Sequence, residues 1–299
     1  MSPATPFRFG VNLSPVASRG SEWADRCRAA ERHGFDVIAV PDHLGVQAPF
    51  SAMVAAAHAT TRARVTTYVL NSAFWNPVLL AREALSAEAL TDGRVEVGVG
   101  TGYVRSEFDT AGVEWGSAGS RVDRLEDTVT SLRALFADPR PLGFTEPPAR
   151  LPVLIGGNGD RVLRLAARHA DIVSFAGAVL APGSARGTLR LIDADAMAER
   201  VRFFEREAGE RAAGLERNIL VQTVVVTPDR SGTAETMRRR LPYLTAQQIV
   251  EVPTLLVGSE EQIAAALLER RERFGFSYVC VHERDMAAFA PVIGLLRGR

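Results

Sequence analysis

The chain has 299 residues, of which 46% are hydrophobic, and its 35 acidic residues balance 35 basic ones. That length can bury one large core or two small ones, and balanced, scattered charge argues against nucleic acid as a partner. No Lys occurs, so all 35 basic residues are Arg. The missing Lys excludes a Schiff-base or Walker-type lysine. Together with abundant Ala, it is typical of GC-rich genomes such as those of actinobacteria.

Apolar runs and amphipathic segments alternate along the chain. Strands are predicted at Phe7–Leu13, Asp36–Val40, Val65–Leu70, Arg94–Val99, Leu151–Ile155, Asp171–Phe175, Ile219–Val226 and Ser277–Val281. Helices are predicted at Glu22–His33, Phe50–Thr61, Pro77–Leu90, Arg121–Phe136, Asp160–His169, Ala194–Gly209, Ala234–Leu241, Glu260–Phe274 and Met286–Leu296. Eight strands alternating with helices predict parallel strands joined by right-handed crossovers.

Eight such strands are the number that closes a (β/α)8 TIM barrel, an α/β fold. An open doubly wound sheet is the alternative. We expect one barrel domain over residues 1–299, with insertions in the loops at the C-terminal face and the clearest one around residues 227–257. In a barrel the chemistry lies at the C-terminal ends of the strands, which makes those ends the places to search.

The remaining composition indicates a reducing, cytoplasmic setting. Cys27 and Cys280 lie within a helical and a strand pattern, where each is most simply a buried small apolar residue. The N-terminus lacks the pattern of a signal peptide, and no apolar run approaches the ~18 residues of a membrane span. We therefore expect a small-molecule substrate and no membrane partner.

Three glycines end the fifth predicted strand, in Leu151–Asp160. Glycine lets backbone amides approach a ligand, and the helix N-terminus that follows favours negative charge, so the loop suits a phosphate. The alternative is an ordinary strand-to-helix turn. The loop is neither a Walker loop, since no Gly-Lys-Ser/Thr follows, nor the dinucleotide fingerprint, since its glycines are too closely spaced.

Other strand ends carry chemistry as well. Asp42 and His43 follow the second strand and offer an anchor beside an imidazole that can give or take a proton. A second glycine cluster, Gly98–Gly102, follows the fourth strand and precedes Tyr103 and Glu107, and we expect it to leave room for a flat ligand. His282 directly follows the eighth strand. We expect His43, Tyr103, Glu107 and His282 to be the candidates for proton transfer or substrate orientation.

On these residues the chain resembles the bacterial luciferase-like superfamily, and within it the branch that uses the deazaflavin coenzyme F420. The resemblance extends from Phe9 to the closing helix. The matching segments are Pro41–His43, Asn76–Pro77, Asp92–Gly102, Ser106–Phe108 with Gly112, Leu151–Asp160 and Ala170–Val173.

The resemblance implies roles for individual residues. His43 is expected to donate or accept a proton beneath the deazaflavin ring, beside Asp42. The third strand end is expected to carry a non-prolyl cis peptide at Tyr68–Val69 that supports the ring, and the fifth to hold the cofactor phosphate. The cofactor-binding residues implied are Asp42, Tyr68, Val69, Asn71, Thr101, Gly102, Gly156, Gly157, Asn158, Gly159 and Asp160.

The function implied is an F420-dependent oxidoreductase, suited to secondary metabolism, that transfers hydride between the deazaflavin C5 and an activated C=C, C=N or C=O bond. Relatives of this kind are often homodimers. Sugar-phosphate dehydrogenases of the branch carry an acidic residue where this chain has Tyr103, and an Asn where it has Ser106, which argues against glucose 6-phosphate as substrate. Two alternatives stay open: an FMN-dependent monooxygenase, and a catalytically inactive cofactor-binding protein.

Overall fold

Parallel strands close into a barrel in the computed structural model, which describes residues 6–14, 19–180 and 189–299. The hydrogen-bonded order is β3-β2-β1-β13-β10-β7-β6-β5-β4, and a further pairing of β3 with β5 closes the ring. The barrel strands are β1 (Arg8–Asn12), β2 (Val37–Val40), β3 (Arg64–Thr67), β4 (Leu70–Asn71), β5 (Val95–Gly100), β6 (Val153–Gly156), β7 (Ile172–Phe175), β10 (Glu216–Val221) and β13 (Phe276–His282).

Two of these strands are halves of one barrel position. Both β3 and β4 pair in parallel with β5, at Val65 with Val95 and at Leu70 with Val99. Counted together they give eight positions, so the predicted TIM barrel is confirmed and the open sheet is wrong. The predicted third strand is interrupted at its middle by the cis peptide bond Tyr68–Val69, which the structure contains as expected.

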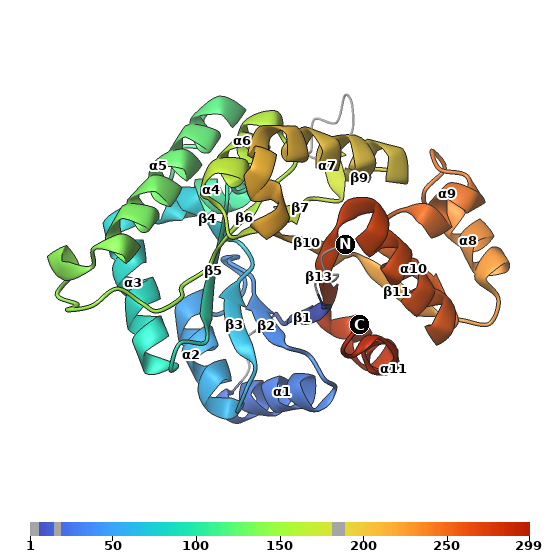
Figure 1. Ribbon diagram of the computed structural model, residues 1–299, viewed down its shortest axis with the longest axis horizontal. Coiled ribbons are helices and arrows are strands. Elements are labelled where there is room, and N and C mark those ends of the chain that lie inside the picture. Colours follow the sequence, from blue (N-terminus) through green and yellow to red (C-terminus); the bar gives the residue numbers. More distant parts are fainter. Residues whose placement is uncertain (1–5, 15–18, 181–188) are drawn as a thin grey trace.

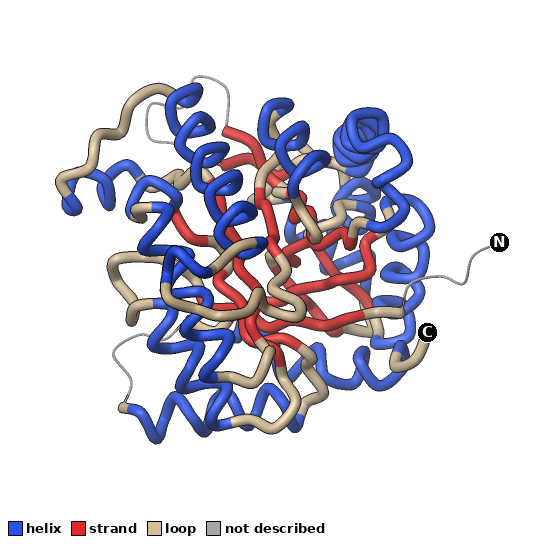
Figure 2. The backbone as a smooth tube through the Cα atoms, turned by 60° about the vertical axis from the view of Figure 1, so that its left-hand side comes forward, coloured by secondary structure: helices blue, strands red, loops and turns tan. Residues whose placement is uncertain are grey.

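Helices surround the barrel (Figures 1 and 2). They are α1 (Gly20–Arg32), α2 (Pro49–Ala59), α3 (Pro77–Leu90), α4 (Arg105–Ala111), α5 (Ala118–Ala137), α6 (Asp160–His169), α7 (Ala194–Ala208), α8 (Arg230–Arg238), α9 (Ala246–Glu251), α10 (Glu260–Phe274) and α11 (Met286–Leu296). Local sequence sets several of their starts. Pro77 and the Asn76 cap begin α3, and Ser259 with Gln262 forms a capping box on α10.

The core has two parts, as a barrel requires. One large cluster lies between the strands and the helices, and a smaller one fills the barrel interior with residues such as Val37, Leu154, Ile172 and Cys280. Both Cys27 and Cys280 are free and buried, as predicted, and burial raises the pKa of each thiol to about 12. Neither thiol is reactive at neutral pH.

Buried charges seal the N-terminal end of the barrel. The Glu96 carboxylate is fully buried and binds the guanidinium groups of Arg8 and of Arg64, the latter at 2.8 Å from its Nε. Arg8 also donates to Glu216, with 3.0 Å from Nε to Oε1. Because the charges compensate one another inside the protein, this end is a structural plug, and the opposite end is left for function.

The seventh predicted strand, Ile219–Val226, is wrong as a single element. The chain leaves the barrel at Gln222, and β11 (Thr223–Val226) pairs with β12 (Leu255–Gly258) in a separate two-stranded sheet. The β-branched run continues through both pieces, so its composition could not reveal the break. The predicted insertion helix lies earlier than expected, as α8, and is joined by α9; both lie outside the ring at the right of Figure 1.

Two long loops at the C-terminal face contain structure that the sequence pattern did not indicate. Helix α4 follows β5, and a hairpin of β8 (Ala178–Leu180) and β9 (Leu189–Leu191) follows β7. Both elements are too short to display a periodic pattern of hydrophobic residues. Within the described ranges, no helix is long and apolar enough to span a membrane.

Candidate active site

A histidine and a glutamate meet at the C-terminal end of the barrel. The His43 Nδ1 lies 2.9 Å from Glu107 Oε1, and these residues come from the end of β2 and from α4. The Tyr103 ring stands edge-on to the imidazole, with 5.9 Å between centroids. A carboxylate only accepts hydrogen bonds, so the contact places a proton on Nδ1 and leaves Nε2 to face other partners. Three of the four predicted proton-transfer residues therefore form one cluster.

Asp42 is held as an anchor next to this histidine. Its Oδ2 accepts hydrogen bonds from the Asn71 backbone N–H and from Trp75 Nε1, each at 3.1 Å. Burial raises the pKa of the Asp42 carboxyl, and these two hydrogen bonds oppose the shift. Asp42 thereby ties the end of β2 to the end of β4, and it sets the position of His43 through the chain.

The glycines at the end of β5 leave space that other residues of the protein occupy. A Cβ on Gly100 would lie 2.8 Å from Val69 Cγ2, and one on Gly98 would lie 2.2 Å from the Thr67 carbonyl oxygen. A Cβ on Gly102, whose φ is +70°, would lie 2.5 Å from the Asn71 side chain. The sequence suggested that these glycines leave space for a flat ligand. In the structure the residues around the cis peptide fill that space.

The side chain of Tyr68 points into the barrel interior. Its hydroxyl donates to Asn218 Oδ1 at 2.5 Å, and Ser174 Oγ donates to the same oxygen at 2.6 Å. Burial raises the pKa of the Tyr68 phenol well above its usual value, so the ring stays neutral. A ligand above the barrel can contact the backbone here, together with the half-buried Val69, and not the phenol.

The Gly156–Asp160 loop has open donors. A Cβ on Gly159 would meet nothing within 4 Å, and no side chain caps the N-terminus of α6, which begins at Asp160. Both polar side-chain atoms of Asn158 are buried without a hydrogen-bond partner. Buried polar groups ordinarily have partners, so this amide and the free N–H groups of the helix fit an anionic oxygen ligand such as a phosphate. Gly157, by contrast, packs against Val162 and donates its N–H to Ser174 O at 3.0 Å.

Nearby charges are already paired. Asp160 binds Arg200 at 2.6 Å, Arg161 binds Asp123 at 2.6 Å, and Arg164 lies 3.3 Å from Glu207. In the described chain Arg121 has no carboxylate within ion-pair distance; its guanidinium stacks over Trp115 at 3.8 Å and its Nε is buried without a partner. The sequence does not single out Arg121 as an unpaired cation, because its position resembles that of any exposed arginine on a helix.

His282 lies apart from the His43 cluster. It ends β13, which is separated from β2 by β1 in the barrel order, and its Nε2 lies 3.4 Å from Gln222 Oε1. Burial, and after it the charge of Arg284, lowers the pKa of His282. The ring is therefore neutral at pH 7, and with Gln222 it forms a second polar region at the C-terminal end of the barrel.

The aromatic side chains near the mouth serve mostly as packing. Phe108 is fully buried between Phe74 and Trp115, at centroid distances of 5.2 and 4.8 Å. Trp75 packs edge-on against Phe50 and anchors Asp42. Of Phe74, Trp75, Tyr103 and Trp115, Tyr103 alone is exposed, at 66%. Two cavities of about 380 and 500 Å³ lie away from these strand ends and do not define the site.

A barrel with a His–Glu pair and an uncapped glycine loop at its C-terminal face is the architecture of a (β/α)8 enzyme. The chain belongs to the luciferase-like monooxygenase family, whose sequence model matches residues 4–246. This confirms the resemblance drawn from the motifs. In the described ranges no three His, Cys, Asp or Glu side chains group as a metal site would require.

Relatives and solved structures extend the comparison. The F420-dependent glucose-6-phosphate dehydrogenase of Segniliparus rotundus is 30% identical over 187 residues, which cover 56% of this chain and 56% of that protein. The chain therefore matches about half the length of such relatives. An F420-dependent secondary alcohol dehydrogenase, solved with an F420-acetone adduct, shares the fold with a TM-score of 0.75 and 20% identity over 98% of both chains. A riboflavin lyase solved with modified FMN has a TM-score of 0.72 and 15% identity, over 97% of this chain and 92% of its own.

Proposed function

We propose that the protein is an F420-dependent oxidoreductase acting on an activated C=C, C=N or C=O bond of a small organic molecule. The observation that carries the proposal is the His43–Glu107 pair, 2.9 Å apart, at the same barrel end as the uncapped glycine loop. Bound F420 would supply hydride exchange at C5. The names of the sequence relatives support this cofactor.

The residues that would hold the cofactor are those with free donors or open surface. Asn158, Gly159 and the first amides of α6 suit the phosphate, because their polar atoms lack partners within the protein. Val69, Thr101 and Gly102 lie at the ends of the strands between this loop and His43 and would border the ring.

His43 would then give or take the proton that accompanies hydride transfer. Glu107 holds the imidazole by Nδ1, so Nε2 is the nitrogen left for substrate. Asp42 fixes the backbone next to it. The exposed Tyr103 and Leu44 at this end favour an uncharged organic substrate over a sugar phosphate.

The test is turnover with reduced F420 by two single variants. Removal of a general acid–base group costs about 10²–10⁴-fold in rate, so His43→Ala should lose at least about 100-fold in kcat while F420 binds within a few-fold of wild type. Glu107→Ala should lose about tenfold or more. The matched control is Asp109→Asn, on the same helix, whose carboxylate is exposed and lies 3.9 Å from Arg105; its activity should stay unchanged. His43→Ala turnover within a few-fold of wild type overturns the role of His43.

An FMN-dependent monooxygenase is the second candidate, and one observation favours it. The oligoglutamyl tail of F420 would need cations, yet Arg161 and Arg164 beside the loop are already paired with carboxylates. Titration with each cofactor separates the two functions. Tight binding of FMN without binding of F420 would replace the first proposal by the second. Tight binding of a cofactor without turnover of enones, imines or nitro compounds would indicate an inactive cofactor-binding protein.

A further inference from the structure

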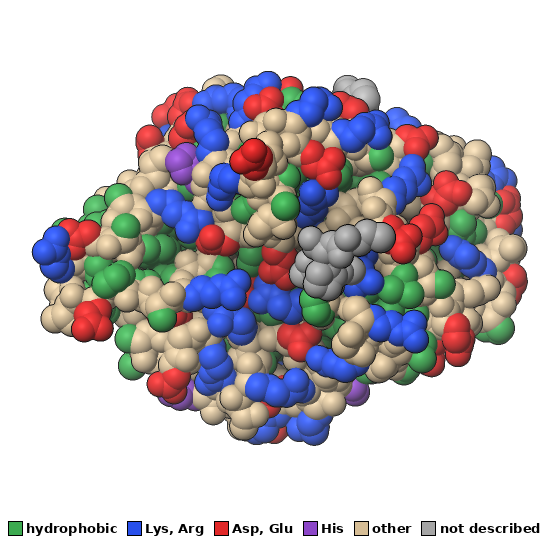
Figure 3. Space-filling view, viewed as in Figure 1, with side chains coloured by type: hydrophobic (Ala, Val, Ile, Leu, Met, Phe, Trp, Pro, Cys, Tyr) green, Lys and Arg blue, Asp and Glu red, His purple; other side chains and the backbone are tan. Residues whose placement is uncertain are grey.

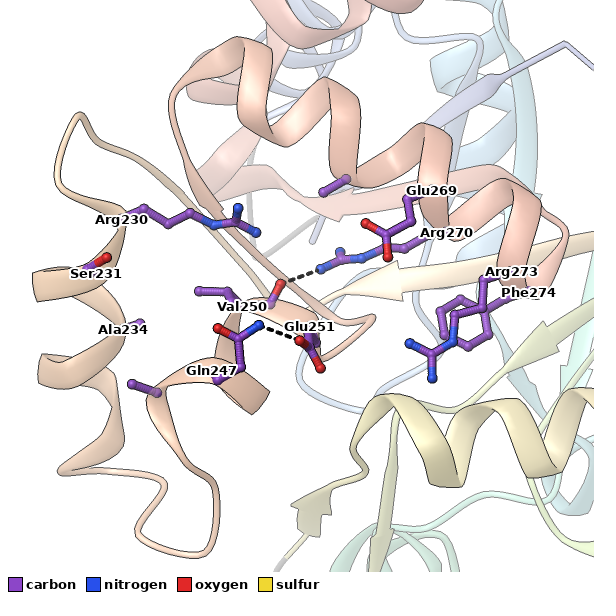
Figure 4. Close-up of a pocket in the computed structure, with 12 residues that line it drawn as sticks. Arg230, Ser231, Ala234, Gln247, Val250, Glu251, Glu269, Arg270, Arg273 and Phe274 are labelled. Carbon is purple, nitrogen blue, oxygen red and sulfur yellow. Dashed lines mark hydrogen bonds between the residues drawn. The ribbon is translucent and has the colours of Figure 1, made fainter.

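A crevice remote from the C-terminal ends of the barrel strands lies between the insertion helices α8 and α9 and helix α10 (Figure 4). Its volume is about 380 Å³. Arg230 comes from α8, and Arg270 and Arg273 come from α10. Ala246, Val250 and Ala266 supply an apolar wall. The crevice thus combines three guanidinium groups with room for a small molecule.

Arg270 carries a buried charge without a counter-ion. Arg270 is only 6% exposed. Its guanidinium donates hydrogen bonds to the carbonyl oxygens of Pro253, Val250 and Leu255 at 3.1, 3.3 and 2.8 Å. Within the described chain no carboxylate lies within 4.0 Å of it. Burial, and after it the charge of Arg230, lowers the pKa of Arg270 to about 10, so the group remains protonated at pH 7. Three bonds use part of its five donors.

Arg230 faces this charge from the other side. Figure 4 shows its side chain extending from the start of α8 over the gap toward Arg270. Its Nε is buried and has no hydrogen-bond partner, and no ion pair of Arg230 occurs among the described residues. Buried N–H groups ordinarily find an acceptor. Two guanidinium groups that point toward one gap, with unused donors, create a place for an anion.

The acidic residues of the crevice do not cancel this charge. Glu251 and Glu269 are both exposed, and Glu251 accepts a hydrogen bond from Gln247. Water screens exposed carboxylates more strongly than it screens the buried Arg270. Arg273 is already compensated by Asp195 at 2.8 Å. The floor of the crevice is therefore positively charged, while its rim carries charges of both signs.

We propose that this crevice binds a small organic anion, a carboxylate or a phosphate ester. The head group lies between Arg230 and Arg270, and the apolar body lies against Ala246, Val250 and Ala266. The proposal is independent of the function assigned to the barrel mouth, which these residues do not border.

Calorimetric titration of the full chain with benzoate, which offers a carboxylate on an apolar body, tests the site. Wild type should show saturable binding to one site, and Arg230→Gln should weaken it at least about tenfold, the usual loss for a charge-assisted hydrogen bond. The matched control is Arg238→Gln, which removes the same charge from the same helix at an exposed residue paired with Glu235; its affinity should stay at the wild-type value. Thermal unfolding of each variant confirms that it is folded.

A second variant keeps every charge and removes the space. Ala266→Leu fills the wall of the crevice and should abolish benzoate binding. Arg230→Gln and Ala266→Leu should leave titration with F420 or FMN unchanged. Absence of saturable benzoate binding to wild type, or an equal loss in Arg230→Gln and Arg238→Gln, would overturn the proposal, because the first leaves no site and the second indicates only general screening of charge.

Discussion

Gly100 and Val69 offer a direct test of why the mouth of this barrel is rich in glycine. A Cβ at Gly100 would lie 2.8 Å from Val69 Cγ2, well inside the 3.4–4 Å of ordinary contact. Overpacking of this kind costs about 1–3 kcal/mol, so Gly100→Ala should lower the free energy of unfolding by that amount. Gly100 does not have positive φ, so an alanine backbone fits there and the cost is attributable to the contact.

The double variant provides the decisive measurement. Val69→Ala alone should cost about 1–2 kcal/mol, because it removes two methyl groups from a half-buried side chain. With both substitutions the new methyl at residue 100 enters space that Val69 has left. The double variant should therefore be at least about 1 kcal/mol more stable than additivity predicts. Equilibrium unfolding in urea, followed by tryptophan fluorescence, measures all four proteins.

Gly98 is the matched control for this cycle. A Cβ there would lie 3.2 Å from Val69 Cγ1 but only 2.2 Å from the Thr67 carbonyl oxygen, a backbone atom that no side-chain substitution removes. Gly98→Ala should thus be destabilising with or without Val69→Ala. If the Gly100–Val69 pair is simply additive, or if Val69→Ala rescues Gly98→Ala equally well, packing by Val69 is not the reason for these glycines.

Two further predictions concern stability. Burial raises the pKa of the Glu31 carboxyl, but hydrogen bonds from the backbone N–H groups of Arg62, Ala63 and Thr61 outweigh it and lower the pKa to about 2. Because the pKa of Glu31 is lower in the folded than in the unfolded protein, its ionised carboxylate stabilises the folded state at pH values above its ordinary pKa of 4.5. Glu31→Gln should therefore cost about 1–2 kcal/mol at pH 7 after allowance for solvent screening, and the difference from wild type should shrink as pH falls from about 4.5 toward 2 in urea titrations; a difference independent of pH contradicts this. Asn218→Leu would remove the acceptor that the buried hydroxyls of Tyr68 and Ser174 share and leave them only their 3.3 Å contact with each other. It should cost about 2–5 kcal/mol in the same assay, and a loss below about 1 kcal/mol would show that the network is not needed.

Surface charge agrees with the expectation drawn from composition. Acidic and basic side chains are interspersed over the face shown in Figure 3. Two arginines near the glycine loop are individually paired with acids of neighbouring helices, Arg161 with Asp123 and Arg164 with Glu207. Such pairs cannot be predicted from the sequence, because an ion pair between helices far apart in the chain leaves no local pattern.

The sequence by itself determined the architecture. Apolar runs of strand length alternate with amphipathic helices, and such local periodicity survives whatever the long-range packing is. It also predicted a site at Asp42–His43 and at the Gly156–Asp160 loop, because strand ends in a parallel barrel meet at one face. The closing helix α11 matches its predicted bounds, Met286–Leu296.

Only the tertiary structure decided how these parts work together. The contact of His43 with Glu107 joins residues 64 positions apart, and the departure of the chain from the barrel at Gln222 occurs inside one uninterrupted β-branched run. The glycines of β5 looked like space for a ligand, whereas Val69 and Asn71 fill much of it. Periodicity reports which face of an element is buried, but a pairing, a filled gap or an ion pair depends on which distant residues the closed barrel brings together.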